Sequence, residues 1–375
     1  MTTSGFFHEK ASSSIFAREI EAILDQARWA PSGDNTQPWR FQIIDDSRLI
    51  VHLLAARMRA EDFYSSLDER SLFLVGGILL ETMRIAASTY GRSLIWTSTG
   101  EDQGVHRIAV KLVPEPVKVD PLAPFIPVRS VDRYAYRTTP LTAAQKLALT
   151  DALGTGFGIL WRESLAERWR SAILNTIATD IRLRIPETFK THQHAIDWDH
   201  DLSPTAIPAR AVGLDGLSLA LMRRLMSGDW KRLDWMNRFA GGTVLARAEL
   251  DLLPGLLCGA HFIIYRKTPA STPEAFIDAG AALQRFWLSA TAAGLVMQPA
   301  YATLLFALSA QSGYRFTVNR LMLQKAAALR ERLVAFSGID PATMVFLGRL
   351  GAPRARRTVS RSIRQPLEKL LLNSR

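Results

Sequence analysis

Cysteine is nearly absent from this sequence, and its scarcity excludes several kinds of site. Cys258 is the only cysteine among 375 residues, so the chain cannot form an intramolecular disulfide or hold a metal or iron–sulfur cluster with several cysteine ligands. A reducing compartment is the natural environment of such a chain. Cys258 itself lies in the apolar run Leu-Leu-Cys-Gly-Ala, which favours a small core residue over a reactive thiol.

Long hydrophobic runs are missing as well. The most apolar stretches, 252–265 and 295–308, are interrupted by Pro, Gly, His or Gln, and they fall short of the roughly 20 apolar residues that cross a bilayer. The first residues, MTTSGFFHEKASSS, have no basic start, apolar core or small-residue cleavage site of a secretory signal. We therefore expect a cytoplasmic protein that makes no membrane contact.

Glycine and proline show no excess, with 23 and 18 residues, which excludes collagen-like and low-complexity classes. Hydrophobic residues make up 48% of the chain, enough for one large domain or two ordinary ones. The segment 114–127 holds five prolines and therefore cannot be an interior helix or a central strand. We expect it to be an extended connector.

Acidic residues are fewer than basic ones, 35 against 46, and arginines gather near the end, in 351–364. Such a cluster suits nucleic acid, an acidic membrane or a phosphate-bearing small molecule, because guanidinium groups bind phosphate oxygens wherever these are presented. A solvated terminal helix is the simpler alternative, and the cluster alone does not decide between them.

Hydrophobic periodicity and capping residues predict an alternation of helices and strands. The capping box at Thr142 and the pair Thr272-Pro273 each mark the start of a helix. The other predicted elements are a helix that contains 20–27 and ends before Pro31, a hairpin of 41–44 and 49–53, a helix over 71–90, strands at 93–97, 106–113 and 295–298, and a helix from 273 to 294.

The two longest predicted helices resemble each other. The glycines that delimit 77–91 and 280–294 have equal spacing, and each closing glycine leads into a short apolar strand. Leu80, Met83 and Ala87 of the first helix correspond to Leu283, Phe286 and Ala290 of the second. This similarity indicates a weak internal duplication, although core helices that end at glycine are common.

The most specific local motif is the run 30–39, Ala-Pro-Ser-Gly-Asp-Asn-Thr-Gln-Pro-Trp. Its proline and glycine force a turn, and Ser32, Asn35 and Gln37 offer short polar side chains from that turn. Amide side chains carry both a donor and an acceptor, as needed to bind the polar edge of a planar heterocycle. A polar turn without a ligand, with Trp39 as a core plug, is the alternative.

This run resembles the APS-x-x-N-x-QPW signature of the nitroreductase superfamily of flavin enzymes. The segment 129–133 (RSVDR) resembles the Arg-rich entry segment of that family, with both outer arginines kept and the middle Arg and Ser/Thr replaced by Ser130 and Val131. The helix from Gly280 to Gly294, and a terminal strand followed by Gly, Pro and arginines at 346–357, are similar to two further family features.

The resemblance implies an α+β fold in which an antiparallel-rich sheet is wrapped by helices. Because the 30–39 loop and the Arg segments lie in different parts of the chain, the sequence is similar to tandem Acg-like members, with two related halves, 1–118 and 119–375, that form an intrachain pseudo-dimer. One composite FMN site is then implied, with Ser32, Asn35 and Gln37 from one half, and with Arg129, Arg133, Arg356 and Arg357 from the other holding the phosphate.

The resemblance further implies FMN-dependent oxidoreduction, with NAD(P)H as the donor and an electron-poor or heterocyclic small molecule as the substrate. An inserted segment at about 182–255 fits a lid over the flavin, and amphipathic helices are expected to turn Trp230 and Trp235 inward, with Met222 and Met226 also in the ceiling. We expect a monomer that binds no nucleic acid, with further dimerisation possible.

Two other functions stay open. One is a flavin-binding or sequestering protein without turnover. The other is a metal-dependent enzyme that uses the cluster at 192–201, where three His and three Asp occur in ten positions. A solvated or lid-forming segment is the simpler interpretation of that cluster, because it contains no fixed metal motif, and no metal ligand is assigned.

Overall fold

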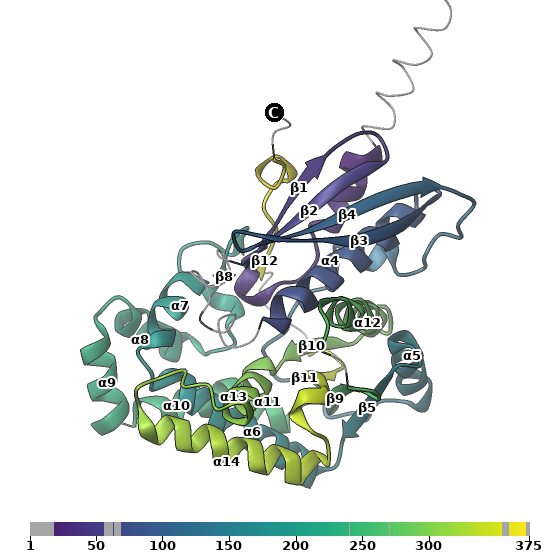
Figure 1. Ribbon diagram of the computed structural model, residues 1–375. Helices are drawn as coiled ribbons and strands as arrows, with labels where there is room; N and C mark the ends of the chain where they lie inside the picture. Colours follow the sequence, from purple (N-terminus) through teal and green to yellow (C-terminus); the bar gives the residue numbers. More distant parts are fainter. Residues whose placement is uncertain are drawn as a thin grey trace, which may run out of the picture.

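The computed structural model describes residues 19–55, 63, 69–239, 241–269, 271–354 and 360–372. The structure contains two four-stranded sheets, each fully antiparallel, which lie one below the other in Figure 1. Helices surround both sheets. The predicted α+β class with antiparallel sheets is therefore confirmed. A helix over 19–27 precedes the first strand and ends before Pro31, as its sequence pattern predicts.

The first sheet has the order β1-β2-β4-β3. A tight hairpin around Asp45 joins its first two strands, as predicted, because Asp45 accepts hydrogen bonds from the backbone N–H groups of Ser47 and Arg48 at 2.9 and 2.8 Å. Its elements are β1 (Trp39–Ile43), β2 (Arg48–Leu54), α4 (Arg70–Ser88), β3 (Arg92–Asp102) and β4 (Val105–Pro114).

The second sheet repeats this order with strands that are further apart in the sequence, as β5-β9-β11-β10. In both sheets the long helix lies between the second and third strands in chain order. Its elements are β5 (Phe157–Arg162), β9 (Ala260–Arg266), α12 (Pro273–Ala292), β10 (Val296–Pro299) and β11 (Met344–Gly351), after α5 (Ala143–Leu153). The predicted caps at Thr142 and Thr272 are confirmed.

The two long helices, α4 and α12, cross at a pair of glycines. A Cβ atom on Gly77 would lie 1.8 Å from the carbonyl oxygen of Ile277, and one on Gly280 would lie 2.0 Å from that of Leu74. These contacts are reciprocal, because each glycine faces the residue that lies three positions before the other. The helices can therefore approach this closely only without side chains at both positions.

Polar contacts beside the crossing are reciprocal as well. Glu81 pairs with Arg285 at 3.0 Å, and Gln284 donates to the hydroxyl of Thr82 at 2.9 Å. Self-complementary contacts of this kind are what a two-fold relation between two similar units produces. The interpretation of the chain as two related halves stays a prediction, and these contacts favour it.

A large segment, which we call the insertion, lies between β5 and β9. Its helices lie beside the second sheet and extend to the left of Figure 1. They are α6 (Leu165–Leu183), α7 (Glu187–Ala195), α8 (Gly216–Met226), α9 (Trp230–Phe239), α10 (Gly242–Arg247), the π-helix η4 (Ala248–Leu252) and α11 (Leu253–Leu256). Short strands pair as β6 (Ile196–Asp197) with β8 (Ile207–Pro208), and β7 (Leu202–Ser203) with β12 (Arg361–Ser362).

Two more helices, α13 (Tyr301–Ser312) and α14 (Arg320–Ser337), pack with α6 and the second sheet around a separate apolar cluster. The connector 114–127 contains only a short 3-10 turn, η2 (Ala123–Phe125), in agreement with its prolines. The remaining 3-10 turns are η1 (Gly33–Asn35), η3 (Ala209–Ala211), η5 (Pro341–Thr343) and η6 (Leu367–Lys369).

The last described residues return to the first sheet (Figure 1). The backbone N–H of Phe41 donates to the carbonyl of Leu370 at 2.9 Å, and that of Leu372 donates to the carbonyl of Phe41 at 2.7 Å. The segment thereby covers the edge strand β1, which would otherwise present unpaired backbone groups.

One apolar core contains residues from both sheets and both long helices, so the two parts of the chain share a hydrophobic core. Among the described residues, α4 is the one helix that is long and apolar enough to cross a membrane, and 89% of its apolar window is buried inside the protein. This burial is what a central core helix shows.

Candidate functional site

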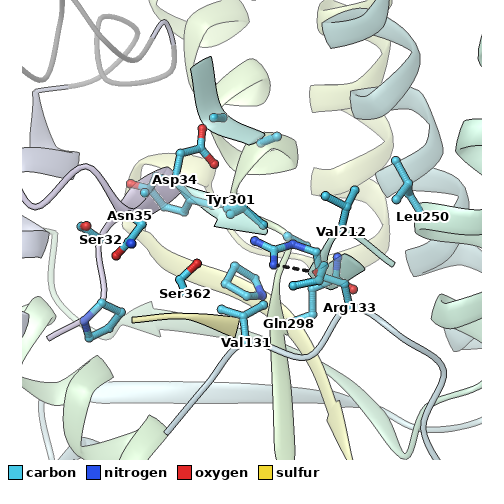
Figure 2. A pocket seen from close by; sticks show the side chains of 18 of the residues that line it. Ser32, Asp34, Asn35, Val131, Arg133, Val212, Leu250, Gln298, Tyr301 and Ser362 are labelled. Carbon is cyan, nitrogen blue, oxygen red and sulfur yellow. Dashed lines mark hydrogen bonds between the residues drawn. The ribbon is translucent and has the colours of Figure 1, made fainter. Parts of the chain in front are cut away.

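A cavity of about 390 Å³ lies where the two parts of the chain meet. Its wall is formed by the 31–35 loop, residues 129–133, the facing sides of α4 and α12, the start of α13, the insertion and residues 361–364. Figure 2 shows side chains from these separate segments around the same space. A volume of this size, with an apolar wall and a few polar groups, is typical of small-molecule and cofactor sites.

The 32–37 loop enters the cavity with a constrained backbone. Asp34, Asn35 and Gln37 have φ values of 44°, 63° and 48°, in the left-handed region that disfavours side chains. Each such residue costs on the order of 1 to 3 kcal/mol, so the surrounding contacts must hold the loop in place.

Two buried amides supply that support. The Asn35 side chain donates to the carbonyl of Ile363 at 3.0 Å, and the Gln37 side chain donates to the carbonyls of Asn35 and Pro204 at 2.9 and 2.8 Å. Gln37 also accepts from the backbone N–H of Gln365 at 2.9 Å. These bonds tie the loop to the insertion and to the C-terminal segment.

The predicted cofactor contacts from this loop therefore divide into two groups. Ser32 and Asn35 line the cavity, whereas the amide of Gln37 is occupied by protein partners away from the cavity wall. Sequence reasoning could not separate them, because the partners of Gln37 lie more than 150 residues away in the chain.

Arginines concentrate at one end of the cavity. Arg129, Arg361 and Arg364 all line it, and within the described ranges none of the three forms an ion pair with a carboxylate. Burial, reinforced by the charges of Arg364 and Arg361, holds the pKa of Arg129 well below its usual value. Burial and the charge of Arg361 lower the pKa of Arg364 to about 9. We call these three residues the arginine triad.

The triad is fixed by neutral groups only. The guanidinium of Arg129 lies 4.6 Å from the ring centre of Trp287, and its buried Nε has no hydrogen-bond partner in the part of the chain that the structure describes. Arg364 donates to the carbonyl of Ala30 at 3.0 Å. Three neighbouring cations with an unsatisfied buried donor are unfavourable on their own, and a bound dianion would relieve both the repulsion and the missing hydrogen bond.

The other arginines that the sequence predicted at the site, Arg133, Arg356 and Arg357, do not belong to the triad. Arg133 lines the cavity, where Figure 2 shows it, and donates to the carbonyl of Ala211 at 3.3 Å. Arg356 and Arg357 lie outside the described residues. Arg361 and Arg364 belong to the basic cluster at 351–364 that the sequence reveals. The spacing of the arginines in this cluster does not show which of them line the cavity.

The insertion contributes to the cavity wall, with some of the side chains that the sequence suggested and without others. Met222 and Met226 line the cavity, as expected. The inward placement of Trp235 is wrong, because 61% of this side chain is exposed. Trp230 packs on Phe189 at 5.8 Å in a small cluster of its own and does not line the cavity. Solvent exposure of one tryptophan is possible because α9 lies on the outer surface of the insertion (Figure 1).

The His/Asp cluster at 192–201 is not brought together. His192 lines the cavity, whereas His200 pairs with Asp197 at 3.0 Å at the surface and Asp199 pairs with Arg223 at 2.8 Å. Among the described residues, no group of three or more His, Cys, Asp or Glu is arranged to hold a metal ion. The metal-dependent alternative therefore has no geometric support in this part of the chain.

Cys258 is a buried core residue, as its sequence context suggests. Burial raises the pKa of its thiol to about 11, so the nucleophilic thiolate is scarce near neutral pH.

Comparison with known proteins finds a similarity over one segment of the chain. Residues 11–69 match the model of the nitroreductase family, over a segment that includes the 30–39 motif. The predicted similarity to the nitroreductase superfamily is thereby confirmed for this part of the chain. No curated protein is significantly similar to the sequence.

Among solved structures, one similar chain is the FMN-dependent nitroreductase NfnB from Mycobacterium smegmatis in complex with NADPH. The two chains are 12% identical, and the aligned region covers 67% of this chain and 96% of the other, with a TM-score of 0.36.

Proposed function

We propose that this protein is an FMN-dependent oxidoreductase that uses a reduced nicotinamide donor and a small-molecule acceptor. The observation that carries the proposal is the arginine triad, which faces the same cavity as the loop of the nitroreductase motif. The family match over 11–69 supports the same class of enzyme. The triad supplies the charge that a phosphate requires, and the motif loop supplies polar groups beside it.

The residues of the cavity fit FMN in chemistry. Arg129, Arg361 and Arg364 would hold the phosphate, because a phosphate monoester carries about −1.5 to −2 charge at pH 7 and guanidinium groups bind it through charge-assisted hydrogen bonds. Apolar side chains such as Val75, Trp287 and Phe346 line the cavity as well and would accept a flat ring.

When bound, FMN supplies hydride transfer, and the protein contributes orientation and electrostatics. The 32–35 loop presents polar groups from a backbone that is held rigidly by buried amides, so these groups need no reordering when a ligand enters. The insertion would exclude water and restrict access, since its residues Met222, Met226 and Leu250 line the cavity. We infer from this cover that the protein accepts fewer substrates than an open flavin site would.

The proposal includes one FMN per chain, in a site that is shared between two related halves. The reciprocal contacts between α4 and α12 and the repeated strand order support this arrangement. A monomer is then sufficient to form the site, and further dimerisation is not needed for it.

Titration of the FMN-free protein, followed by quenching of flavin fluorescence, tests the phosphate site. Arg129→Gln removes a charge-assisted contact that contributes about 1.5 to 3 kcal/mol, so FMN affinity should fall about ten- to hundred-fold. Arg332→Gln on the exposed face of α14 is the matched control and should leave the affinity unchanged. Equal FMN affinity in the two variants would contradict the site.

Thermal unfolding of the same variants separates a binding effect from a folding defect. Without FMN, Arg129→Gln should not lower the unfolding temperature, because it removes a buried charge that two neighbouring arginines repel. Anaerobic addition of NADPH to the FMN-loaded protein then tests turnover. Bleaching of the flavin absorption supports an oxidoreductase, whereas bound flavin that NADPH and NADH cannot reduce supports the sequestering alternative.

A further inference from the structure

The cavity carries more positive charge than the phosphate of FMN can neutralise. Its charged lining comprises six arginines and two aspartates. His192 adds no charge, because burial lowers its pKa to about 3. The lining therefore has four more cations than anions, while a phosphate monoester brings about −1.5 to −2. Roughly two positive charges remain without a counterion after the phosphate is bound.

About half of this surplus lies at the end of the cavity away from the triad, because the three cations of the triad exceed the charge of the phosphate by about one. Arg182, in the last turn of α6, faces the cavity together with Arg133, and both influence the pKa of Asp34, although burial has the larger effect on that carboxyl. Arg182 also acts on Asp251 of the π-helix η4, whose pKa burial raises. We call Arg133, Arg182, Asp34 and Asp251 the insertion-side cluster.

Hydrogen bonding in the insertion-side cluster is incomplete. The Nε of Arg182 and the Oδ2 of Asp251 are both buried, and neither has a hydrogen-bond partner among the described residues. Within the described part of the chain, neither Arg133 nor Arg182 is in ion-pair contact with a carboxylate. Buried polar atoms are normally satisfied, and a π-helix segment frequently marks a functional site. Both observations indicate that a ligand completes the cluster.

The charge balance favours a monoanion. Arg349 lines the same end and is held by the carbonyls of Arg133 and Tyr134 at 2.8 and 2.9 Å. With it, three guanidinium groups face two carboxyls, which leaves a single positive charge when both carboxyls are ionised. The triad, in contrast, has three cations and no carboxylate partner among the described residues.

We propose that the insertion-side cluster is a second anion subsite, which binds the carboxylate group of the acceptor substrate through Arg133 and Arg182. The substrate is thus a small acidic molecule with an apolar or aromatic body, since the cavity between the two charged ends is lined by Leu74, Ile78 and Met226. This assignment rests on the proposed function, and it deepens that function by naming the class of substrate.

Isothermal titration calorimetry of the full-length protein tests the subsite with two probes of equal shape, benzoate and the neutral benzamide. We expect benzoate to bind about ten-fold or more tightly than benzamide, because a charge-assisted bond is lost in the amide. Arg182→Gln should abolish this preference, and Arg182→Lys should keep part of it. Arg170→Gln, an exposed position on the same helix, should keep all of it.

The outcomes distinguish the two proposals. Calorimetry needs no flavin signal, so it is performed both before and after saturation with FMN. Failure to bind FMN overturns the proposed function, whereas equal affinity for benzoate and benzamide overturns the subsite even if FMN binds. The subsite would also be overturned if NADP⁺ displaced benzoate and other aromatic carboxylates did not, because the cluster would then serve the nicotinamide donor. If Arg182→Gln does not fold, Arg133→Gln provides the same comparison.

Discussion

The closest contact between the two long helices leads to a prediction that is independent of function. In Gly77→Ala the new methyl group would lie 1.8 Å from the backbone oxygen of Ile277, about half the distance at which ordinary contact begins. The oxygen belongs to the backbone of α12, so no side chain can rotate away. The helices would have to separate by more than an ångström along the centre of the shared core.

The magnitude follows from two opposing effects. Alanine is a better helix former than glycine by about 0.8 to 1 kcal/mol, so Gly77→Ala would stabilise an isolated helix. Overpacking of a core costs about 1 to 3 kcal/mol and occasionally more, and contact with a rigid backbone belongs at the upper end. We expect a net loss of at least about 2 kcal/mol in the free energy of unfolding.

A neighbouring glycine provides the control. In Gly76→Ala the closest approach of the methyl group would be to the Cδ1 of Leu53 at 2.7 Å, and the end of a leucine side chain can move. We expect this variant to remain within about 1 kcal/mol of the parent protein, since improved helix propensity offsets the repacking. Urea unfolding, followed by far-UV circular dichroism, measures both variants under the same conditions.

The reciprocal glycine adds a sharper test. Gly280→Ala should cost about as much as Gly77→Ala, because its methyl group would lie 2.0 Å from the oxygen of Leu74. The double variant should cost less than the sum, because helices that are already separated accommodate the second methyl group. The reasoning is refuted if Gly77→Ala is as stable as Gly76→Ala, or if the two reciprocal variants are strictly additive.

Three further predictions concern pH, the motif loop and the cover of the cavity. Burial lowers the pKa of His261 to about 4, so the unfolded chain takes up this proton first. Stability should therefore fall as pH decreases from about 6.5 towards 4, by about 2 kcal/mol at pH 5 from this group, and His261→Gln should reduce that slope in urea unfolding. Gln37→Ala should cost about 2 kcal/mol or more and weaken FMN binding, measured by unfolding and flavin fluorescence, because it leaves buried partners unsatisfied; unchanged values of both would exclude a supporting role. Met222→Ala should increase reduction of a small quinone by the FMN-loaded protein, and the exposed Trp235→Ala should not; an equal response of the two variants would argue against a cover.

The 30–39 motif shows how far the sequence leads towards the site. It predicts a turn with polar side chains before a hairpin, and it resembles the nitroreductase signature, in agreement with the family match over 11–69. The structure then assigns different tasks within this turn. Ser32 and Asn35 reach the cavity, but Gln37 binds segments that lie far away in the chain. A local pattern cannot reveal such partners, because their proximity arises only after the chain has folded.

The sequence by itself determined the features that depend on neighbouring residues. The caps at Thr142 and Thr272, the hairpin at Asp45 and the boundaries of the long helices follow from local hydrogen bonding and hydrophobic periodicity. The equal spacing of Gly77 and Gly280 within their helices was also visible. Their reciprocal contact was not, because it depends on how two distant helices cross.

Only the tertiary structure decided the membership of the site. The basic cluster at 351–364 suggested an anion site as one of two alternatives. The folded chain then places Arg361 and Arg364 of this cluster beside Arg129 at the junction of the two parts. Arg182 and Asp251 carry no motif, and they face the cavity because the insertion contributes to its wall. Electrostatic energy depends on distance and on exclusion of water, and both are properties of the folded chain that the order of residues does not display.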